Sequence, residues 1–161
     1  MADTFTVQIA TPERVVLEKE VVSLVAPAYD GYLGIWARHA PLAAELKVGE
    51  LTLTEPGGRQ DALAVSGGFL AVSGNVATIL ADAAELAEEI DLARAESAAE
   101  RARERLAELR DPGARKHVDG ERARLALLRA VNRLTVARKR LLAVPPTPKV
   151  LPPKTANSTV D

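Results

Sequence analysis

The chain of 161 residues contains no cysteine, and this absence excludes several kinds of site. Without thiols there is no disulfide framework, no cysteine-ligated zinc site and no thiol nucleophile. Only two histidines are present, His39 and His117, so a histidine-rich metal site is excluded as well. The sequence has no apolar run of about 18 residues, so no segment is predicted to cross a membrane as a helix.

Aromatic residues make up only 3% of the sequence, and all five precede residue 70. Residues 1–84 also contain eight of the ten glycines and carry a net charge of −5. Residues 85–144 contain no aromatic residue and carry a net charge of +3. The overall charge of −1 therefore hides two different regions, and it provides no bulk basic field for nucleic acid.

Short apolar segments separated by turn signals fill residues 4–80. Residues 4–9 alternate polar and apolar side chains, which is typical of a half-buried strand. Residues 56–58, Pro-Gly-Gly, predict a hairpin loop, and residues 66–68, Ser-Gly-Gly, are interpreted as a turn between two strands. Strands of this length with regular turn signals predict an all-β sandwich or barrel.

Helical periodicity replaces this pattern after Asp82. Residues 81–110 contain ten alanines and neither glycine nor proline, and Asp111-Pro112-Gly113 ends the segment. Leucine and valine at helical spacing predict a second helix that ends before Pro145, so the pair forms an antiparallel α-helical hairpin. An alanine seam buries little area per residue, so we expect the hairpin to detach easily, with partner surfaces deciding its position.

The sequence thus predicts three parts. Residues 1–84 form a β-sandwich domain, residues 85–144 form the helical hairpin, and residues 145–161 form a proline-rich disordered tail. No catalytic constellation accompanies them. Ser66 lies in no G-x-S-x-G motif because residue 64 is alanine, and His39 has no evident acid or nucleophile partner. The residue inventory therefore predicts a protein that is not an enzyme.

Several segments, in order along the chain, resemble one known family, the epsilon subunit of bacterial F-type ATP synthase. The resemblance covers roughly residues 4–140 and lies in residues 30–35 (DGYLGI), 38–42 (RHAPL), 47–49 (KVG), 65–72 (VSGGFLAV), 79–82 (ILAD), 90–95 (IDLARA) and 129–134 (RAVNRL). Each motif alone is weak. Their order and spacing in one chain make the resemblance specific.

The resemblance implies a flattened ten-stranded β-sandwich followed by the helical hairpin. It implies a non-catalytic rotor subunit that couples ion translocation to ATP synthesis as part of the complex. The sandwich would bind the gamma subunit and the c-ring, with Tyr32 and His39 as candidate contacts. The resemblance also places the chain at the cytoplasmic side of the bacterial cell membrane, as a peripheral subunit that meets the membrane only through the complex.

The family's hairpin would switch between a state folded on the sandwich and an extended state. The extended state would reach the catalytic beta and alpha subunits and inhibit ATP hydrolysis. The second helix carries the surplus positive charge suited to an acidic partner. Its candidate inhibitory residues are Arg122, Arg124, Arg129, Arg133, Arg138, Lys139 and Arg140.

Some members of the family bind regulatory ATP in the hairpin, while no cofactor is required. The matching positions here are Glu85, Asp91, Arg94, Arg101, Arg129 and Arg133. A carboxylate can accept protons from a base, and several guanidinium groups can bind a triphosphate. The alternative to a nucleotide site is a salt bridge between Asp91 and Arg94 on a solvated helix face.

Two other functions remain open from the sequence. The arginines would also suit a free-standing ATP-sensing hairpin module that needs no rotor. The basic second helix would suit a nucleic-acid-binding hairpin, but the five aromatic residues lie outside it, which removes stacking platforms for bases. We therefore predict no nucleic-acid partner.

Overall fold

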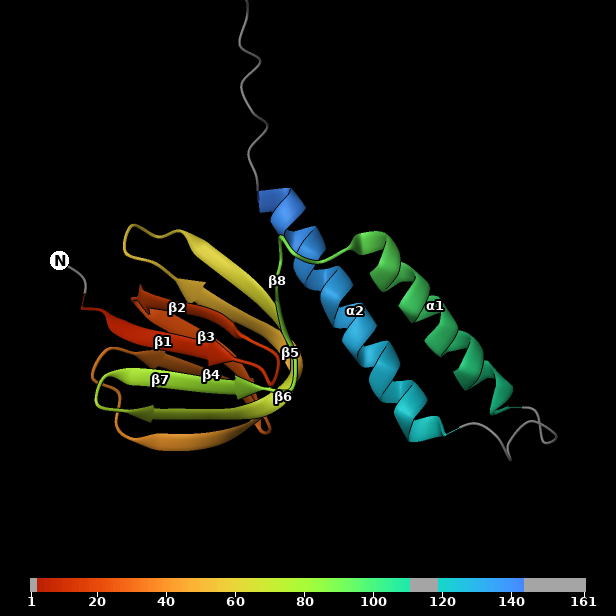
Figure 1. Cartoon of the computed structure of the whole chain (residues 1–161), viewed down its shortest axis with the longest axis horizontal. Coiled ribbons are helices and arrows are strands. Elements are labelled where there is room, and N and C mark those ends of the chain that lie inside the picture. The colour runs from red at the N-terminus through yellow and green to blue at the C-terminus, as the bar shows by residue number, and fades with distance from the viewer. Residues whose placement is uncertain (1–2, 111–118, 144–161) are drawn as a thin grey trace, which may run out of the picture.

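The computed structural model describes residues 3–110 and 119–143. These residues form an N-terminal β-sandwich and a C-terminal hairpin of two helices, α1 (Leu92–Glu108) and α2 (Gly120–Ala143), which lies against one side of the sandwich (Figure 1). The predicted fold class is therefore confirmed. The loop at 111–118 and the predicted tail at 145–161 lie outside the described residues.

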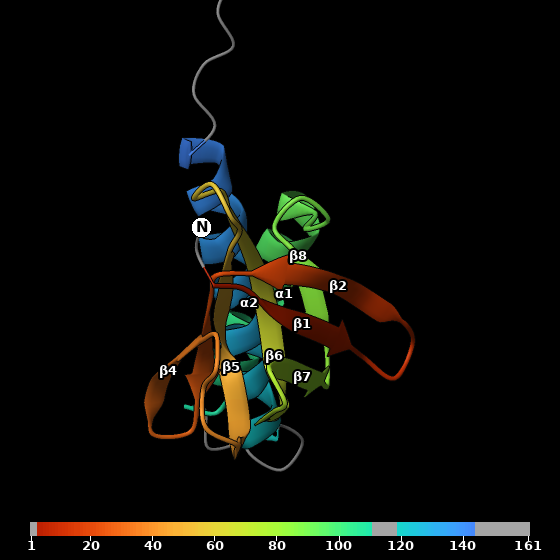
Figure 2. The same ribbon diagram turned by 90° about the vertical axis from the view of Figure 1, so that its left-hand side faces the viewer.

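Eight strands build the sandwich: β1 (Phe5–Ala10), β2 (Val15–Val21), β3 (Ser23–Ala28), β4 (Gly31–Trp36), β5 (Leu42–Thr54), β6 (Gln60–Ser73), β7 (Val76–Ala81) and β8 (Ala84–Leu86). Seven of them follow the order β2-β1-β7-β6-β5-β3-β4, and β8 pairs with β6. Only the β1–β7 pair is parallel. Figure 2 shows how the sheet curls over, so that its strands enclose a core.

The count of eight corrects the ten strands that the resemblance implied. The difference comes from β5 and β6, which are 13 and 14 residues long and stay paired along their whole length. One half of β6 pairs with β7 and the other half with β8, so each long strand serves both faces of the sandwich. Counting the halves of β5 and β6 separately would give ten.

The turn predicted at residues 66–68 is also wrong, because β6 runs through it. Gly67 and Gly68 have φ values of 97° and 114°, a region that side-chain-bearing residues rarely adopt. A Cβ on Gly68 would overlap the backbone of Leu80. The two glycines therefore bend the strand and let β7 approach, and pairing with β5 continues on both sides of the bend. The predicted loop at residues 56–58 is correct.

Large aliphatic side chains fill the sandwich. Alternation places Phe5, Val7 and Ile9 of β1 inside, as the sequence pattern predicts. Each of the remaining seven strands also contributes to this core, which is formed by sandwich residues alone. This region therefore has its own hydrophobic core, independent of the helices.

Each helix begins at an aspartate. Asp91 accepts a hydrogen bond from the backbone N–H of Arg94 at 3.0 Å, and Asp119 accepts one from the N–H of Arg122 at 3.0 Å. Such N-caps satisfy backbone donors that a helix end leaves free. α1 begins eleven residues after Ala81, where the alanine-rich composition starts, because β8 and a turn occupy the interval. β8 also spans the predicted domain boundary between residues 84 and 85.

Alanines form the seam between the two helices and the contact of the hairpin with the sheet. The second cluster of buried residues consists of Ala64, Ile90, Ala95, Ala99, Ala130, Leu134, Val136 and Ala137. Small side chains let the backbones approach closely but bury little area each. Neither described helix is long and apolar enough to cross a membrane.

Candidate functional site

Four arginines line a groove between α1 and α2. Arg101 and Arg105 come from α1, and Arg129 and Arg133 come from α2, spaced i, i+4 on each helix. The groove has a volume of about 270 Å³, and its other lining residues are the alanines Ala98, Ala102, Ala126 and Ala130. Among the residues that the structure describes, no acidic side chain lines it. The small alanines leave the space, and the guanidinium groups make it a place for an anion with several oxygens.

The structure brings together only some of the six predicted nucleotide-binding residues. Three of them, Arg101, Arg129 and Arg133, line the groove. Glu85 on β8 is linked to it, because it accepts hydrogen bonds from Nε of Arg133 at 2.8 Å and from its Nη2.

Asp91 and Arg94 lie at the beginning of α1, about 15 Å and about 10 Å along the helix axis from Arg101 at a rise of about 1.5 Å per residue. The alternative prediction, a salt bridge between Asp91 and Arg94, is not found among the described residues. Asp91 instead accepts from the backbone N–H of Arg94 as the helix N-cap.

The seven predicted inhibitory cations of α2 divide into two groups. Four of them, all toward the C-terminal end, are paired with carboxylates from four different segments: Arg133 with Glu85 of β8, Arg138 with Glu96 of α1, Lys139 with Glu50 of β5, and Arg140 with Glu88 of the β8–α1 linker. Within the described part of the chain, Arg122, Arg124 and Arg129 form no ion pair. The packing of α2 on the sandwich and on α1 thus pairs the cations of its C-terminal half with carboxylates.

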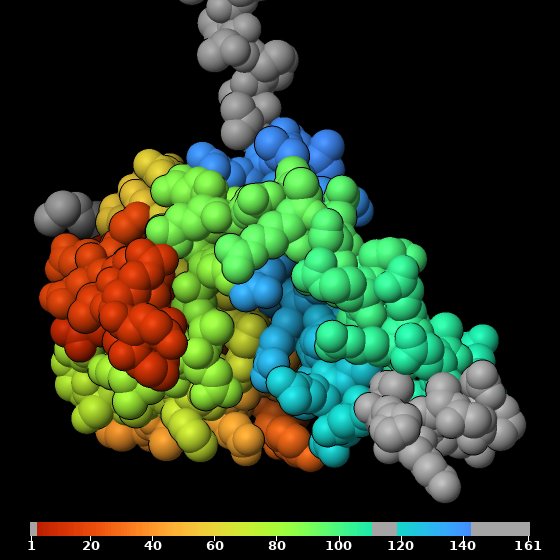
Figure 3. Space-filling view, turned by 45° about the vertical axis from the view of Figure 1, so that its right-hand side comes forward, coloured from red at the N-terminus to blue at the C-terminus, as the bar shows by residue number. Residues whose placement is uncertain are grey.

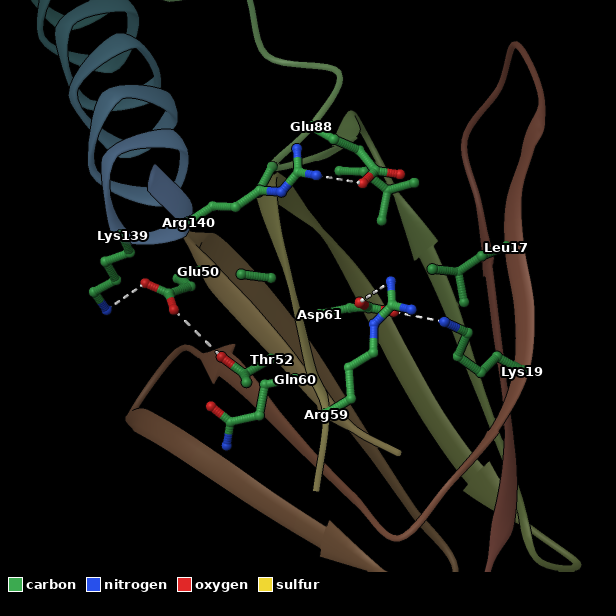
Figure 4. Close-up of a pocket in the computed structure, with 13 residues that line it drawn as sticks. Leu17, Lys19, Glu50, Thr52, Arg59, Gln60, Asp61, Glu88, Lys139 and Arg140 are labelled. Atoms are coloured by element: carbon green, nitrogen blue, oxygen red, sulfur yellow. Dashed lines mark hydrogen bonds and ion pairs between the residues drawn. The ribbon is translucent and has the colours of Figure 1, made fainter. Parts of the chain in front are cut away.

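A hollow of about 490 Å³ lies where the last turns of α2 meet β2, β5 and β6 (Figure 4). Its cations alternate with carboxylates, and the dashed contacts run from Lys139 to Glu50, from Arg140 to Glu88, and from Lys19 and Arg59 to Asp61. The hydrogen bond to Asp61 raises the pKa of Lys19, and the one to Glu50 raises the pKa of Lys139. Each cation that lines the hollow is paired with a carboxylate, and the pairs of Lys139 and Arg140 make this surface an ion-paired seam between hairpin and sandwich.

The linker between β8 and α1 is anchored separately. Nη2 of Arg14, in the β1–β2 turn, donates to Glu89 at 2.7 Å, and Glu89 also accepts from the backbone N–H of Leu86. The hydrogen bond from Arg14 lowers the pKa of Glu89. The path of the chain into α1 is therefore fixed to the sandwich by a charged pair.

Four of the five aromatic side chains are exposed, which is unusual for so apolar a residue type. Tyr29, Tyr32 and Trp36 all belong to the β3–β4 hairpin at one edge of the sheet, and Tyr32 is 67% exposed. The fourth, Phe69 on β6, lies directly opposite Leu80 on β7, and both are more than half exposed. The sandwich therefore presents apolar side chains at two separate places.

The two predicted contact residues of the sandwich lie at opposite ends of β4. Tyr32 follows the β3–β4 turn, whereas His39 lies in the loop after Trp36. Nδ1 of His39 is 2.8 Å from the carbonyl oxygen of Ala40, and its backbone N–H donates to Trp36. His39 is partly buried, so Tyr32 is the more accessible of the two.

The sequence did not predict two residues that the structure places at the candidate site or at the contact between α2 and the sheet. Arg105 lies one turn after Arg101, and this i, i+4 spacing would have placed it in the groove. Asn132 of α2 donates to the backbone of β5 and β6. No local pattern indicates Asn132, because its acceptors are more than 60 residues away in the chain.

Comparisons with known proteins agree with this architecture over most of the chain. A family model described as "ATP synthase, Delta/Epsilon chain, beta-sandwich domain" matches residues 4–87. A second, described as "ATP synthase, Delta/Epsilon chain, long alpha-helix domain", matches residues 88–138. The two models meet in the linker that Glu89 anchors.

Among curated relatives, the "ATP synthase epsilon chain" of Desulfitobacterium hafniense is 44% identical over 138 residues, covering 86% of this chain and 99% of that protein. The protein of the same name from Moorella thermoacetica is 46% identical over 134 residues, covering 83% and 96%. A chain in the structure of the Euglena gracilis mitochondrial ATP synthase, OSCP/F1/c-ring, superposes with a TM-score of 0.65 at 24% identity, covering 86% of this chain and 81% of that one. The last of these comparisons concerns the fold alone.

Proposed function

The chain belongs to the family of ATP synthase epsilon chains, and on this premise we propose that it is a rotor subunit whose hairpin restrains ATP hydrolysis. Its relatives are epsilon chains, which are distinct from the catalytic chains of the complex. The single observation that carries the proposal is that the two regions are held by different contacts. The sandwich has its own core, whereas the hairpin is attached through alanines and ion pairs.

Docking to the rotor is assigned to the sandwich. Exposed aromatic side chains in a chain this poor in aromatics favour contact with other proteins. We assign the β3–β4 edge with Tyr32 to the c-ring and the face with Phe69 and Leu80 to the gamma subunit. The chain then meets the cytoplasmic side of the bacterial membrane only through the complex.

Inhibition is assigned to α2. In the folded state Arg138, Lys139 and Arg140 are occupied by carboxylates of this chain. Extension of the hairpin would free these cations for acidic segments of the catalytic beta and alpha subunits. Two arrangements that satisfy the same charges with different carboxylates can lie within a few kcal/mol of each other, as a two-state element requires.

Two truncated chains test this proposal in the assembled enzyme. A chain ending at residue 87 should still bind the gamma subunit, since the sandwich core lies within residues 5–84, and should raise the rate of ATP hydrolysis. A chain ending at residue 143 keeps both helices and is the matched control, with a rate equal to that of the full chain. An unchanged rate with the shorter chain bound would refute the inhibitory role, and failure of the full chain to bind any gamma subunit would refute the rotor role.

Regulatory ATP binding is a second proposed function, favoured by the arginine groove. A volume of about 270 Å³ is below the usual size of about 300–1,000 Å³ for a ligand pocket, so it suits the phosphates rather than a whole nucleotide. Asp91 would then accept a hydrogen bond from an N–H of the base, beyond the groove. A nucleotide bridging α1 and α2 would favour the folded hairpin.

Calorimetry with ATP tests the groove. Arg129→Gln removes a guanidinium that lines it, and should weaken binding by about tenfold to a hundredfold, the usual range for a charge-assisted hydrogen bond. Arg124→Gln is the control, because Arg124 is also exposed on α2 but lies outside the groove. Equal affinities in the two variants would refute the site. ATP binding without any gamma binding would instead favour the free-standing ATP-sensing module.

A further inference from the structure

One uncharged polar side chain, that of Asn132, joins α2 to the sandwich beside the ion pairs and the apolar contact. Asn132 is partly buried, and its Nδ2 donates to the backbone carbonyl oxygens of Gly49 at 2.8 Å and of Val65 at 3.3 Å. Gly49 on β5 and Val65 on β6 are directly opposite each other in the sheet. A single amide group therefore binds both long strands at the same level.

The apolar part of this contact specifies position poorly. The buried cluster that includes this contact contains Ala62, Ala64 and Ala87 on the sandwich side and Val136 and Ala137 on α2, with the larger Ile90 and Leu134 beside them. Similar small side chains present similar shapes, so sliding or rotating the helix exchanges one such contact for another at small cost. Figure 3 shows α2 recessed between α1 and the sandwich, where a small shift would alter both contacts. A donor that has to reach two fixed acceptors, in contrast, is satisfied in one position only.

The rotation of α2 decides where its arginines point. Successive residues of a helix are separated by about 100°, so an Asn132 held against the sheet directs Arg133 to the neighbouring flank. There Arg133 meets Glu85 on β8 and, with Arg129, lines the arginine groove.

We propose that Asn132 is the positioning residue of the hairpin: its amide fixes the docked position and rotation of α2 on the sandwich and so places Arg129 and Arg133 in the groove. The first half of this inference concerns docking alone. The second half rests on the proposed nucleotide site.

Two nearly isosteric substitutions test the docking half in the full chain. Because the chain has no cysteine, Val15→Cys on β2 and Leu142→Cys on α2, both at exposed positions, can carry a pair of fluorophores whose energy transfer reports docking. A urea titration makes a shift measurable even when the starting chain is fully docked. Asn132→Leu removes the donor and should lower the ratio of docked to undocked hairpin by about tenfold. Asn132→Asp should lower it further, since carboxylate oxygens would face two carbonyl oxygens.

The ranking of the variants by their ratio of docked to undocked hairpin distinguishes a positioning role of Asn132 from a packing role. If only shape mattered, Asn132→Asp would dock like the unchanged chain and Asn132→Leu would dock as well or better. Either result overturns the proposal. Thr135→Val is the control, because the Thr135 hydroxyl donates only to Val131 within α2, and its ratio should not change.

Titration of the same variants with ATP separates this inference from the proposed function. Asn132→Leu should weaken ATP binding by a factor similar to its effect on docking, although every arginine is retained. If the unchanged chain binds no ATP but the docking order holds, the nucleotide site fails and the positioning role of Asn132 stands. If ATP binds and the docking order is absent, the site stands and the positioning role fails.

Discussion

The sandwich and the hairpin are held together by different forces. Of the twelve largest fully buried side chains, eleven belong to strands and only Val136 belongs to a helix. The buried residues of α1 are all alanines, Ala95, Ala99 and Ala102. Ion pairs with partly exposed partners, and the hydrogen bonds from the Asn132 amide to the backbone of β5 and β6, attach the hairpin to the sandwich. One chain thus combines a sandwich that has its own apolar core with a hairpin attached mainly by small side chains and ion pairs.

The largest effect is expected in the sandwich core. Leu51→Ala removes a fully buried side chain of β5 and should lower the free energy of unfolding of the sandwich by about 2–5 kcal/mol, the usual cost of such a cavity. Denaturant titration measures it. Val136→Ala is the contrasting substitution on α2, with an expected cost of about 1–2 kcal/mol that weakens hairpin docking only. If Val136→Ala lowered sandwich stability as much as Leu51→Ala, the two regions would not be separable.

A smaller effect is expected from the ion pairs that join α2 to the sandwich. Glu50→Gln and Glu88→Gln remove the partners of Lys139 and Arg140, and exposed pairs contribute only about 0.2–1 kcal/mol each. Docking should therefore weaken with rising salt, and less steeply in the double variant, because salt screens exposed charges. Energy transfer between Val15→Cys and Leu142→Cys over a sodium chloride series measures this.

The control for the salt series removes an ion pair that lies within one helix. Glu100→Gln breaks the pair with Arg103 on α1, which does not connect the hairpin to the sandwich. Its salt dependence should match that of the unchanged chain. A salt dependence of docking that survives unaltered in the Glu50→Gln, Glu88→Gln chain would show that other charges attach the hairpin.

The local sequence pattern is sufficient to predict strands and helices, but it is insufficient to predict the contacts between them. Alternation identified β1 and its buried Phe5, Val7 and Ile9, because a strand with one face in the core has period two. The same kind of evidence failed at Gly67 and Gly68, where glycines that usually mark a turn bend a continuous strand instead. Whether a glycine ends a strand or bends it depends on neighbouring strands, here β5 and β7, which the local sequence does not contain.

The candidate site divides in the same way. Arg129 and Arg133 share a helix face by spacing alone, so their convergence could be predicted. The partners of Arg133 and Asn132, on β8 and on β5 and β6, depend on how the hairpin folds back. The family motif grouped Asp91 with the arginines, but geometry gives it the additional role of helix N-cap, which a short polar residue before a helix commonly takes.

The smallest effect concerns pH and the anchor of the linker. The hydrogen bond from Arg14 lowers the pKa of Glu89 below its ordinary value of 4.5, so this pair stabilises the folded arrangement above pH 4.5 and loses its effect as pH falls through the lowered value. For Lys139 the sign is opposite. Its pKa is raised above 10.5 by Glu50, so its contribution is complete below pH 10.5 and disappears only at higher pH. Docking should therefore be constant between about pH 6 and pH 9.

Glu89→Gln isolates the acid side of this profile. At neutral pH the variant should dock slightly less well than the unchanged chain, because the charged pair with Arg14 is gone. As pH falls through the lowered pKa of Glu89, its carboxylate becomes protonated, so the difference between the two chains should shrink to nothing. Glu104→Gln is a suitable control, since Glu104 is exposed on α1 away from the linker, and its difference should be negligible at every pH. A difference for Glu89→Gln that persists after Glu89 has become protonated would mean that the side chain acts through shape and not through its charge. The linker would then belong with the packed sandwich instead of the ion-paired hairpin.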